Sequence, residues 1–323
     1  MQVISSAPGK AILFGEHAVV YGKPAIAMAL DKRAQVKVSK NTDKKISINI
    51  RDLGIKGHID LKDDSIKSDS PKKGILKYVL SSLKKVHEGS GLDLCIDVNV
   101  PIGGGLGSSA AVTVALIAAV SKYNDMDLGK KDIAGFAHEV ELEVQNSAST
   151  LDTTISTYGG LIYLEKNAKD IISLDINHDI PVVIGYTDSR GNTGKLVESV
   201  KMRKECYPKI INPIIDSIEL ITNEAKHAIL NNDKNRIGEL MNINHGLLDA
   251  LGVNTMELSN MVYTARSAGA YGSKITGAGG GGSILSFCPD GTEKVISALK
   301  KTENAFKADI SKEGVKINVL DED

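Results

Sequence analysis

The stretch PIGGGLGSSAAV, residues 101–112, decides how this chain folds. It follows LDLCIDVNV at residues 92–100, whose alternation predicts a half-buried strand, and it leads into an apolar run that predicts a helix over 109–122. Glycine adopts positive φ and lets the backbone approach a ligand closely. The first N–H groups of the helix have no partner, and together with the helix dipole they favour an anion. The stretch therefore predicts a strand–loop–helix unit that binds phosphate.

The predicted phosphate-binding residues are the loop and the first helical turn. They are Pro101, Gly103, Gly104, Gly105, Leu106, Gly107, Ser108, Ser109 and Ala110. The alternative is a tight glycine turn before a capped helix. Four glycines, two serines and an apolar helix together favour the anion site over that alternative. The loop is not a Walker loop, because no lysine follows its last glycine, and at Ser108 it departs from the dinucleotide-binding fingerprint.

Length and composition exclude several classes of protein. A chain of 323 residues suits two domains, and its 42% of apolar residues can form a packed core. There is no apolar run of the ~18 residues that a membrane-spanning helix needs, and the start lacks the pattern of a secretory signal. We therefore expect a cytoplasmic protein that does not bind membranes. With 39 basic against 40 acidic residues, a general nucleic-acid binder is not expected. The three cysteines lie far apart and suit neither a disulfide framework nor a metal site.

Hydrophobic periodicity predicts an α+β chain of two domains, residues 1–178 and 179–323. Short strands are expected over 1–60, among them QVISS at 2–6 and KAILFG at 10–15, and a charged loop is expected over 61–72. Further strands are expected within 157–166 and 180–188 and near 315–320, and a strand pair within 274–287 brackets a second glycine cluster. The expected helices cover 73–87, 109–122, 131–145, 195–230, 234–250, 255–268 and 291–301.

Three more segments give the glycine loop its context. They read SAPGKAILFGEHAVVYGKPAI at 6–26, SASTLDTTISTYGG at 147–160 and KITGAGGGGS at 274–283. Together with the loop, and in this order, they resemble the motifs of the GHMP kinase superfamily. Lys10 and the GEHAVVYGKPA opening resemble the mevalonate kinase family in particular, as does MNINHGLLDALGVNT at 241–255. The resemblance spans nearly the whole chain. It implies the two-domain GHMP kinase fold, with the active site in the cleft between the domains.

The resemblance also implies cofactors and catalytic roles. ATP would bind at the glycine loop with Mg²⁺. Asp152 would be the catalytic base, and Lys10 would stabilise the charge that develops on the substrate oxygen. Helical periodicity leaves Glu141 and Glu143 as equal candidates, but the family spacing to Asp152 selects Glu141, with Ser109, as a magnesium ligand.

The resemblance places the remaining candidates at the substrate end of the site. They are Glu16, His17, Thr193, Gly277 and Ala278, with Arg190 as a weaker choice. The chain departs from the family at Asn146, where a glycine is usual. Asparagine tolerates left-handed backbone better than most residues, so the turn before Asp152 is expected to survive.

The activity implied is phosphorylation of (R)-mevalonate at its 5-hydroxyl by ATP, by direct in-line transfer, in the mevalonate route to isoprenoids. The resemblance suggests a homodimer. A kinase for another small alcohol, such as phosphomevalonate, is the first alternative, although the opening segment has few basic residues for a second phosphate. A protein that binds ligand without turnover is the second. It would be expected to lack one of Lys10, Ser109, Glu141 or Asp152, and all four are present.

Overall fold

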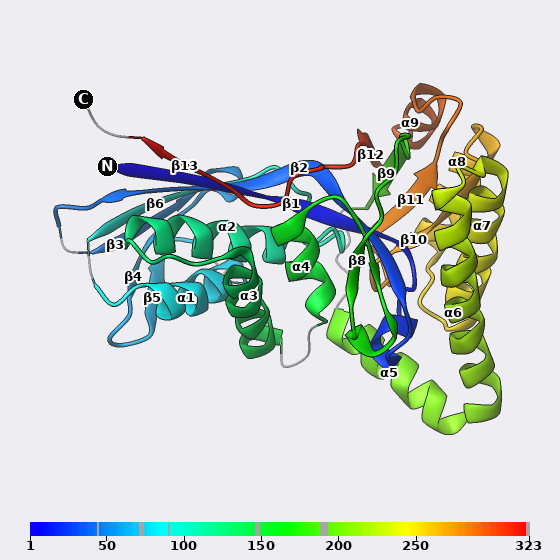
Figure 1. Ribbon diagram of the computed structural model, residues 1–323, viewed down its shortest axis with the longest axis horizontal. Coiled ribbons are helices and arrows are strands. Elements are labelled where there is room, and N and C mark those ends of the chain that lie inside the picture. Colours follow the sequence, from blue (N-terminus) through cyan, green and yellow to red (C-terminus); the bar gives the residue numbers. More distant parts are fainter. Residues whose placement is uncertain (44, 71–73, 90, 146–148, 188–192, 321–323) are drawn as a thin grey trace.

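The computed structural model describes residues 1–43, 45–70, 74–89, 91–145, 149–187 and 193–320. Within these ranges the chain forms two sheets with their own helices, which lie at opposite ends of the molecule (Figure 1). The α+β class and the division into two halves agree with the predicted two-domain fold. No helix of the described residues is long and apolar enough to cross a membrane.

The first sheet has nine strands, with the core order β13-β1-β2-β6-β3-β4-β5, and β7 and β8 extend it beside β2. Its strands are β1 (Gln2–Phe14), β2 (Ala25–Lys40), β3 (Ile46–Ile50), β4 (Ile55–Asp60), β5 (Ser65–Ser68), β6 (Leu92–Val98), β7 (Leu161–Leu164), β8 (Ile171–Ser173) and β13 (Lys316–Leu320). Its helices are α1 (Gly74–Val86), α2 (Ser108–Tyr123), α3 (Lys130–Gln145) and α4 (Thr150–Tyr158). Short 3₁₀ turns occur at η1 (Ala18–Tyr21), η2 (Arg51–Leu53) and η3 (Lys166–Ala168).

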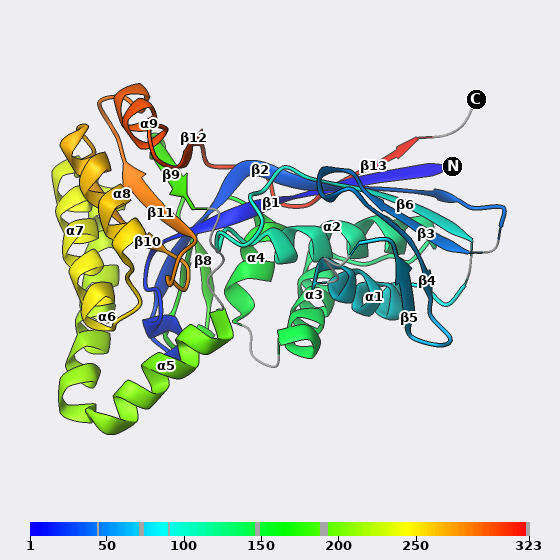
Figure 2. The same cartoon turned by 180° about the vertical axis from the view of Figure 1, so that it is seen from behind.

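The second sheet has the order β10-β11-β9-β12 and is covered mainly by α7, α8 and α9 (Figure 2). Its strands are β9 (Val182–Tyr186), β10 (Gly272–Thr276), β11 (Ser283–Phe287) and β12 (Asn304–Ala308). The helices of this half are α5 (Thr193–Cys206), α6 (Pro208–Leu230), α7 (Lys234–Ala250), α8 (Met256–Ser267) and α9 (Glu293–Leu299).

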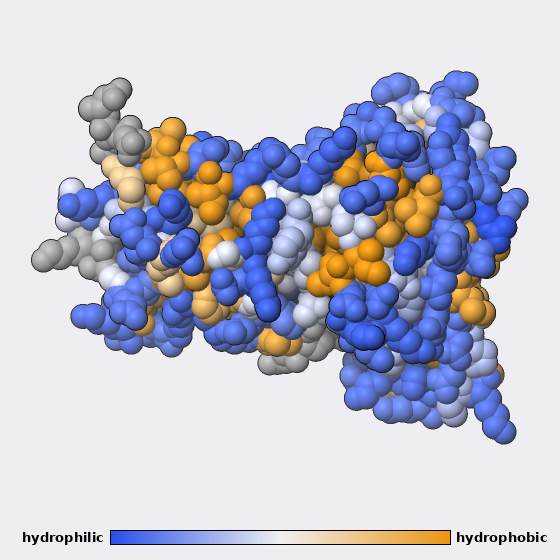
Figure 3. Space-filling model, viewed as in Figure 1, coloured by the Kyte–Doolittle hydropathy of each residue, from blue (hydrophilic) through white to orange (hydrophobic). Residues whose placement is uncertain are grey.

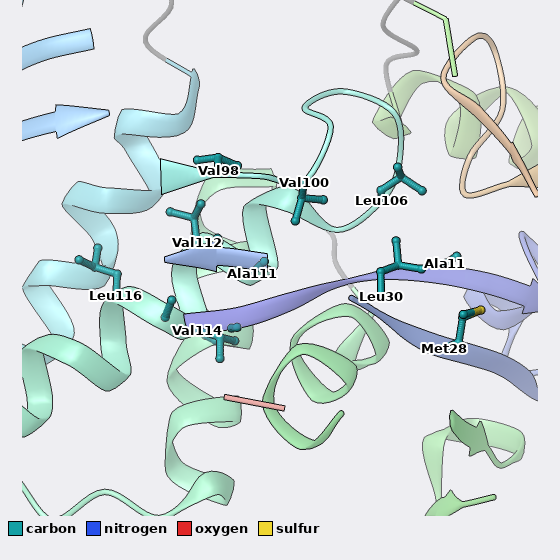
Figure 4. Close-up of a cluster of buried hydrophobic side chains, with 14 of the residues drawn as sticks. Ala11, Met28, Leu30, Val98, Val100, Leu106, Ala111, Val112, Val114 and Leu116 are labelled. Atoms are coloured by element: carbon teal, nitrogen blue, oxygen red, sulfur yellow. The ribbon is translucent and has the colours of Figure 1, made fainter. Parts of the chain in front are cut away.

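Helix α2 forms the centre of the first half. Every residue from Ala110 to Ser121 is buried, because β1 and β2 cover one side of the helix while α1, α3 and α4 cover the others. Figure 4 shows Val112 and Leu116 of this helix in the same apolar cluster as Leu106 of the glycine loop. The loop is therefore anchored at both ends in the core, as an anion site requires.

Strand β1 connects the two halves. The sequence suggested two strands separated by Ala7–Gly9, but the structure shows one strand with a register shift between Pro8 and Lys10. Proline lacks an N–H group and is tolerated in a sheet at such a bulge. Thr276 of β10 bonds the backbone of β1 twice, since its hydroxyl accepts from Ile12 N at 2.9 Å and donates to Ile12 O at 3.0 Å.

The C-terminal strand joins the sheet of the first half, although it follows the predicted domain boundary at residue 178. β13 lies at residues 316–320, where a strand was expected, but it pairs antiparallel with β1 and so completes the first sheet. Apolar surface lies over this strand (Figure 3), where Ile317, Val319 and Leu320 are exposed. The first sheet is thus built from both ends of the chain.

Other elements differ from the sequence prediction in ways that have physical causes. The expected helix 195–230 is two helices, because the residue before Pro208 is disfavoured in the α region and Tyr207 takes φ −129°. Part of the expected loop at 61–72 forms β5, an edge strand paired with β4. Helix α4, which carries Asp152, was not predicted.

Candidate active site

The glycine loop has the geometry expected of an anion cradle. Gly103, Gly105 and Gly107 all have left-handed φ, at 86°, 74° and 70°. Gly107 is the N-cap of α2 and provides no side chain to cap it. The N–H groups of the first turn therefore remain available to a ligand.

Close neighbours also require glycine in this loop. A Cβ atom on Gly107 would lie 2.8 Å from Lys10 Cγ, and one on Gly104 would lie 2.7 Å from Ser283 Oγ. The glycine loop and the third motif pack backbone against backbone, since a Cβ on Gly277 would lie 3.2 Å from Gly105 O. The third motif therefore supports the loop, and Gly277 lies beside it.

Lys10 and Asp152 meet below the glycine loop. Lys10 Nζ lies 3.2 Å from Asp152 Oδ1, and the lysine side chain is 5% exposed against 28% for the aspartate. The backbone of Lys10 is bound to the glycine loop, because its N–H donates to Leu106 O at 2.9 Å. Asp152 lies in the first turn of α4, whose N-cap Ser149 accepts a hydrogen bond from Leu151 N. Two residues far apart in the sequence are thus brought into contact beside the loop.

Glu141, and not Glu143, lies beside the loop. Ser109 Oγ donates to Glu141 Oε1 at 3.4 Å, and the Glu141 side chain is buried. Burial and then the charge of Asp152 raise the pKa of Glu141 to about 8, against the attraction of Lys10. Glu143 faces α1 instead and pairs with Lys85 and Ser81, which lowers its pKa.

Glu16 and His17 have different surroundings. Both carboxylate oxygens of Glu16 are engaged inside the protein, one by the buried Lys274 and the other by Asn244 Nδ2 at 3.3 Å. His17 Nε2 lies 2.9 Å from the carbonyl oxygen of Ala278, so two predicted substrate residues meet. Burial lowers the pKa of His17, although its bond to Ala278 opposes the shift. His17 is therefore neutral near pH 7, whereas the Glu16 carboxylate is fully buried and accepts a hydrogen bond on each oxygen.

The remaining candidates are placed less closely. Thr193 is exposed at the start of α5. Arg190 and Asn146 lie outside the described residues. Pro101, Ser108 and Ala110 flank the glycines at the two ends of the loop.

Sequence reasoning missed three residues of the site. Lys274 and Asn244 bind Glu16, and Tyr78 of α1 lies within hydrogen-bonding reach of Ser109. Burial and the negative charge of Glu141 raise the pKa of Tyr78. Lys274 and Asn244 lie within the quoted segments KITGAGGGGS and MNINHGLLDALGVNT, but no local pattern in these segments marks either residue as a buried partner of Glu16.

Comparison with known proteins places this geometry in a family. The model of the GHMP kinases N terminal domain matches residues 73–160, and that of the GHMP kinases C terminal domain matches residues 225–305. The mevalonate kinase of Methanothermobacter thermautotrophicus is 46% identical over 316 residues, which cover 98% of this chain and 100% of the relative.

Two solved structures share the fold. The Methanococcus jannaschii mevalonate kinase superposes with a TM-score of 0.80 at 28% identity, over 95% of this chain and 98% of that one. The L. major mevalonate kinase in complex with R-mevalonate superposes with a TM-score of 0.82 at 25% identity, over 94% of both chains. The chain therefore belongs to the GHMP kinases and, within them, to the mevalonate kinase family.

Proposed function

We propose that the chain transfers the γ-phosphoryl group of ATP to the 5-hydroxyl of mevalonate, which gives 5-phosphomevalonate and ADP. The observation that carries the proposal is the contact of Lys10 with Asp152, at 3.2 Å, below the left-handed turn at Gly107. The relatives named mevalonate kinase support mevalonate as the acceptor, as does the neighbour that holds R-mevalonate.

In the proposed reaction Asp152 accepts the proton of the acceptor hydroxyl. That oxygen forms a bond to the γ-phosphorus, the bond from phosphorus to the β–γ bridging oxygen breaks, and its electron pair leaves with ADP. The ammonium group of Lys10 balances the charge that develops on the attacking oxygen. The transition state of phosphoryl transfer is loose, so holding the hydroxyl in line contributes more than full deprotonation beforehand.

The residues beside the loop fit a magnesium ion. Glu141 is a buried carboxylate next to a second carboxylate, with the Ser109 hydroxyl 3.4 Å away, and a cation would relieve that repulsion. No cluster of three or more His, Cys, Asp or Glu that could hold a metal occurs among the described residues. Magnesium prefers few protein oxygens, together with phosphates and waters. When bound, it would neutralise charge on the triphosphate, while Ser109 and Glu141 hold it.

Acceptor specificity tests the proposal. ADP release is measured with Mg-ATP and each of mevalonate, 5-phosphomevalonate, homoserine and galactose. We expect release with mevalonate. Release with another acceptor alone would contradict the assigned substrate, and no release from a folded enzyme that binds ATP would support a protein that binds without turnover.

Asp152→Asn tests the proposed base. This variant should bind ATP normally and lose turnover by about 10²-fold or more, the usual contribution of a positioned base. Asp290→Asn is the matched control, because Asp290 accepts a hydrogen bond from Tyr271 in the second half of the chain, away from the loop. Near-normal turnover of Asp152→Asn would remove Asp152 from the mechanism.

A further inference from the structure

A buried ion pair joins the turn after β1 to strand β10. Lys274 Nζ contacts Glu16 Oε1, and both side chains are fully buried. Lys274 also donates to Ile275 O at 2.7 Å, while Asn244 Nδ2 donates to the other oxygen of Glu16. The carboxylate thus receives one hydrogen bond on each oxygen and is held at one position.

The buried ion pair of Glu16 with Lys274 is not expected to add much to the stability of the fold. Burial raises the pKa of Glu16 and lowers that of Lys274, so desolvation opposes both charges. Replacing a buried ion pair with apolar side chains of similar volume is often neutral or stabilising, whereas removal of one partner is strongly destabilising. The pair therefore contributes a defined geometry more than it contributes stability.

The ion pair of Glu16 with Lys274 fixes the position of the next residue, His17. His17 has φ 59°, a left-handed conformation that a residue with a side chain rarely adopts. Such strain persists where the surroundings over-determine the backbone. Two fixed points do so here. Glu16 is tied to Lys274, and shortly after Lys274 in the chain the carbonyl of Ala278 meets His17 Nε2.

The contact with Ala278 sets the tautomer of the imidazole. A carbonyl oxygen only accepts, so Nε2 of the neutral ring carries the proton and Nδ1 keeps its lone pair. Among the described residues, none forms a hydrogen bond with Nδ1 of His17. His245 of α7 also lies near Lys274. Burial and the positive charges of Arg266 and Lys274 lower the pKa of His245 to about 4. His245 is therefore neutral near pH 7 and offers Glu16 no second positive charge.

We propose that Lys274 is a positioning residue that acts through Glu16 to hold His17, with Nδ1 presented as a hydrogen-bond acceptor to a hydroxyl group of the acceptor substrate. This inference rests on the proposed function, because it names the residue that orients the acceptor. It also gives Glu16 a role that needs no contact with substrate.

Steady-state kinetics of Lys274→Met test the proposal. Loss of one aligned hydrogen bond to the acceptor should raise its KM about tenfold and leave the KM for ATP nearly unchanged. Lys23→Met is the matched control. Lys23 joins the same N-terminal segment to α6 through Asp216 at 2.7 Å and Glu219 at 2.5 Å, so its loss should leave both KM values unchanged.

The double variant Glu16→Gln/Lys274→Met separates positioning from stability. It leaves no unpaired buried charge, so its melting temperature should return toward that of the wild type while the acceptor KM stays raised. Recovery of both quantities would show that the pair is only structural and would overturn the proposal. A folded Lys274→Met enzyme with an unchanged acceptor KM would also overturn the proposal.

Nitrogen NMR of the histidine rings gives a readout that does not need turnover. His17, assigned by comparison with His17→Gln, should show a protonated Nε2 and an unprotonated Nδ1 in the wild type, and this signature should be lost in the double variant. An unchanged signature would contradict the proposal. Wild-type inactivity with mevalonate would refute the proposed function instead, and the ring signature would still decide the role of Lys274.

Discussion

At the scale of single residues, Gly107 is required by the side chain beneath it and not by its φ alone. Gly54 provides the comparison, because it has φ 62° and a Cβ atom added there would have no neighbour within 4 Å, whereas a Cβ on Gly107 would meet Lys10. Alanine at either position should lower the free energy of unfolding by ~1 kcal/mol through left-handed strain. Only Gly107→Ala should displace Lys10, and we expect its kcat/KM to fall about 10²-fold, as for a misplacement near 1 Å.

The measurement is steady-state kinetics beside urea unfolding of both variants. Gly107→Ala should lose more stability than Gly54→Ala, because the contact with Lys10 adds to the left-handed strain, and only Gly107→Ala should lose activity. Equal activities would mean that the loop adapts to a methyl group, and that Lys10 does not depend on close packing at this turn.

Glu141 should make metal binding depend on pH. Its pKa of about 8 means that the carboxyl is protonated in the free enzyme near pH 7, whereas a magnesium ligand must be ionised. Binding of magnesium with nucleotide should therefore release a proton at pH 7 and none at pH 9.5. Calorimetry in buffers of different ionisation enthalpy measures this release, and Glu141→Gln, which cannot ionise, is the control. A wild type that releases as little as this variant would contradict the raised pKa.

The same residue makes a stability prediction of definite sign. The folded pKa lies above the ordinary value of 4.5, so the folded state holds the proton more tightly. In the metal-free enzyme this contribution is present below pH 4.5 and is lost as pH rises toward about 8. Glu141→Gln should remove that loss, and its melting temperature should fall less than that of the wild type between pH 5 and pH 8.

Residue types in motifs were predictable, but their partners were not. Helical periodicity could not choose between Glu141 and Glu143, because that choice depends on which of them faces Ser109 across two helices. Lys274 was missed for a similar reason. Its partner lies 258 positions away in sequence, and no local pattern marks a lysine as buried.

At the scale of elements, helix α4 holds Asp152 by its first turn. Ser149 Oγ accepts from Leu151 N at 3.3 Å, and the helix has only nine residues. Ser149→Ala should remove about 1 kcal/mol of stability and let the first turn fray. Since Asp152 lies in that turn, we expect kcat to fall severalfold more than KM rises.

Asp233→Ala is the matched control for the cap. Asp233 caps α7 at Arg236 N, at 3.1 Å, on the exposed start of a longer helix. It should lose similar stability with kcat unchanged. Loss of kcat in both variants would indicate a general effect of stability on activity and would remove the special role of the α4 cap.

The elements that the sequence missed are those whose local preference is weak. α4 reads TLDTTISTY, in which β-branched residues disfavour a helix, and the cap and burial of Leu151 and Ile155 override that preference. α2 and α3 were placed to within a residue or two because their apolar patterns are long. The single strand β1 was divided at Pro8 because the sequence cannot distinguish a bulge from a break.

At the scale of the whole molecule, the two-domain class was predictable. The pairing of the C-terminal strand β13 with β1 was not. The sequence showed a strand near 315–320, whereas its partner follows from tertiary packing alone. The C-terminal segment is fastened along the first half, since Ser311 N donates to Ala29 O at 2.9 Å and Val315 N donates to Thr157 O at 3.1 Å. We therefore expect the two halves to unfold in one transition.

Arg33 of β2 holds this segment most extensively. Its guanidinium donates to Ser311 Oγ at 3.0 Å, to Glu313 O at 3.1 Å and to Gly314 O at 2.6 Å. It also donates to the side chain and the backbone of Ser6 on β1. Lysine keeps the charge but lacks the planar fork, so it cannot reach all of these acceptors.

Arg33→Lys should therefore lower the free energy of unfolding by about 2 kcal/mol. It should also speed hydrogen exchange of the β13 amides beyond that of the second sheet. Arg51→Lys is the control, since the exposed Arg51 makes one 3.5 Å contact with Asp97 and its loss should change little. Exchange that rises equally in both sheets would mean that the segment is held by the β1–β13 ladder alone. Faster hydrogen exchange confined to the β13 amides would show that Arg33 holds the C-terminal segment. Unfolding would then begin at β13.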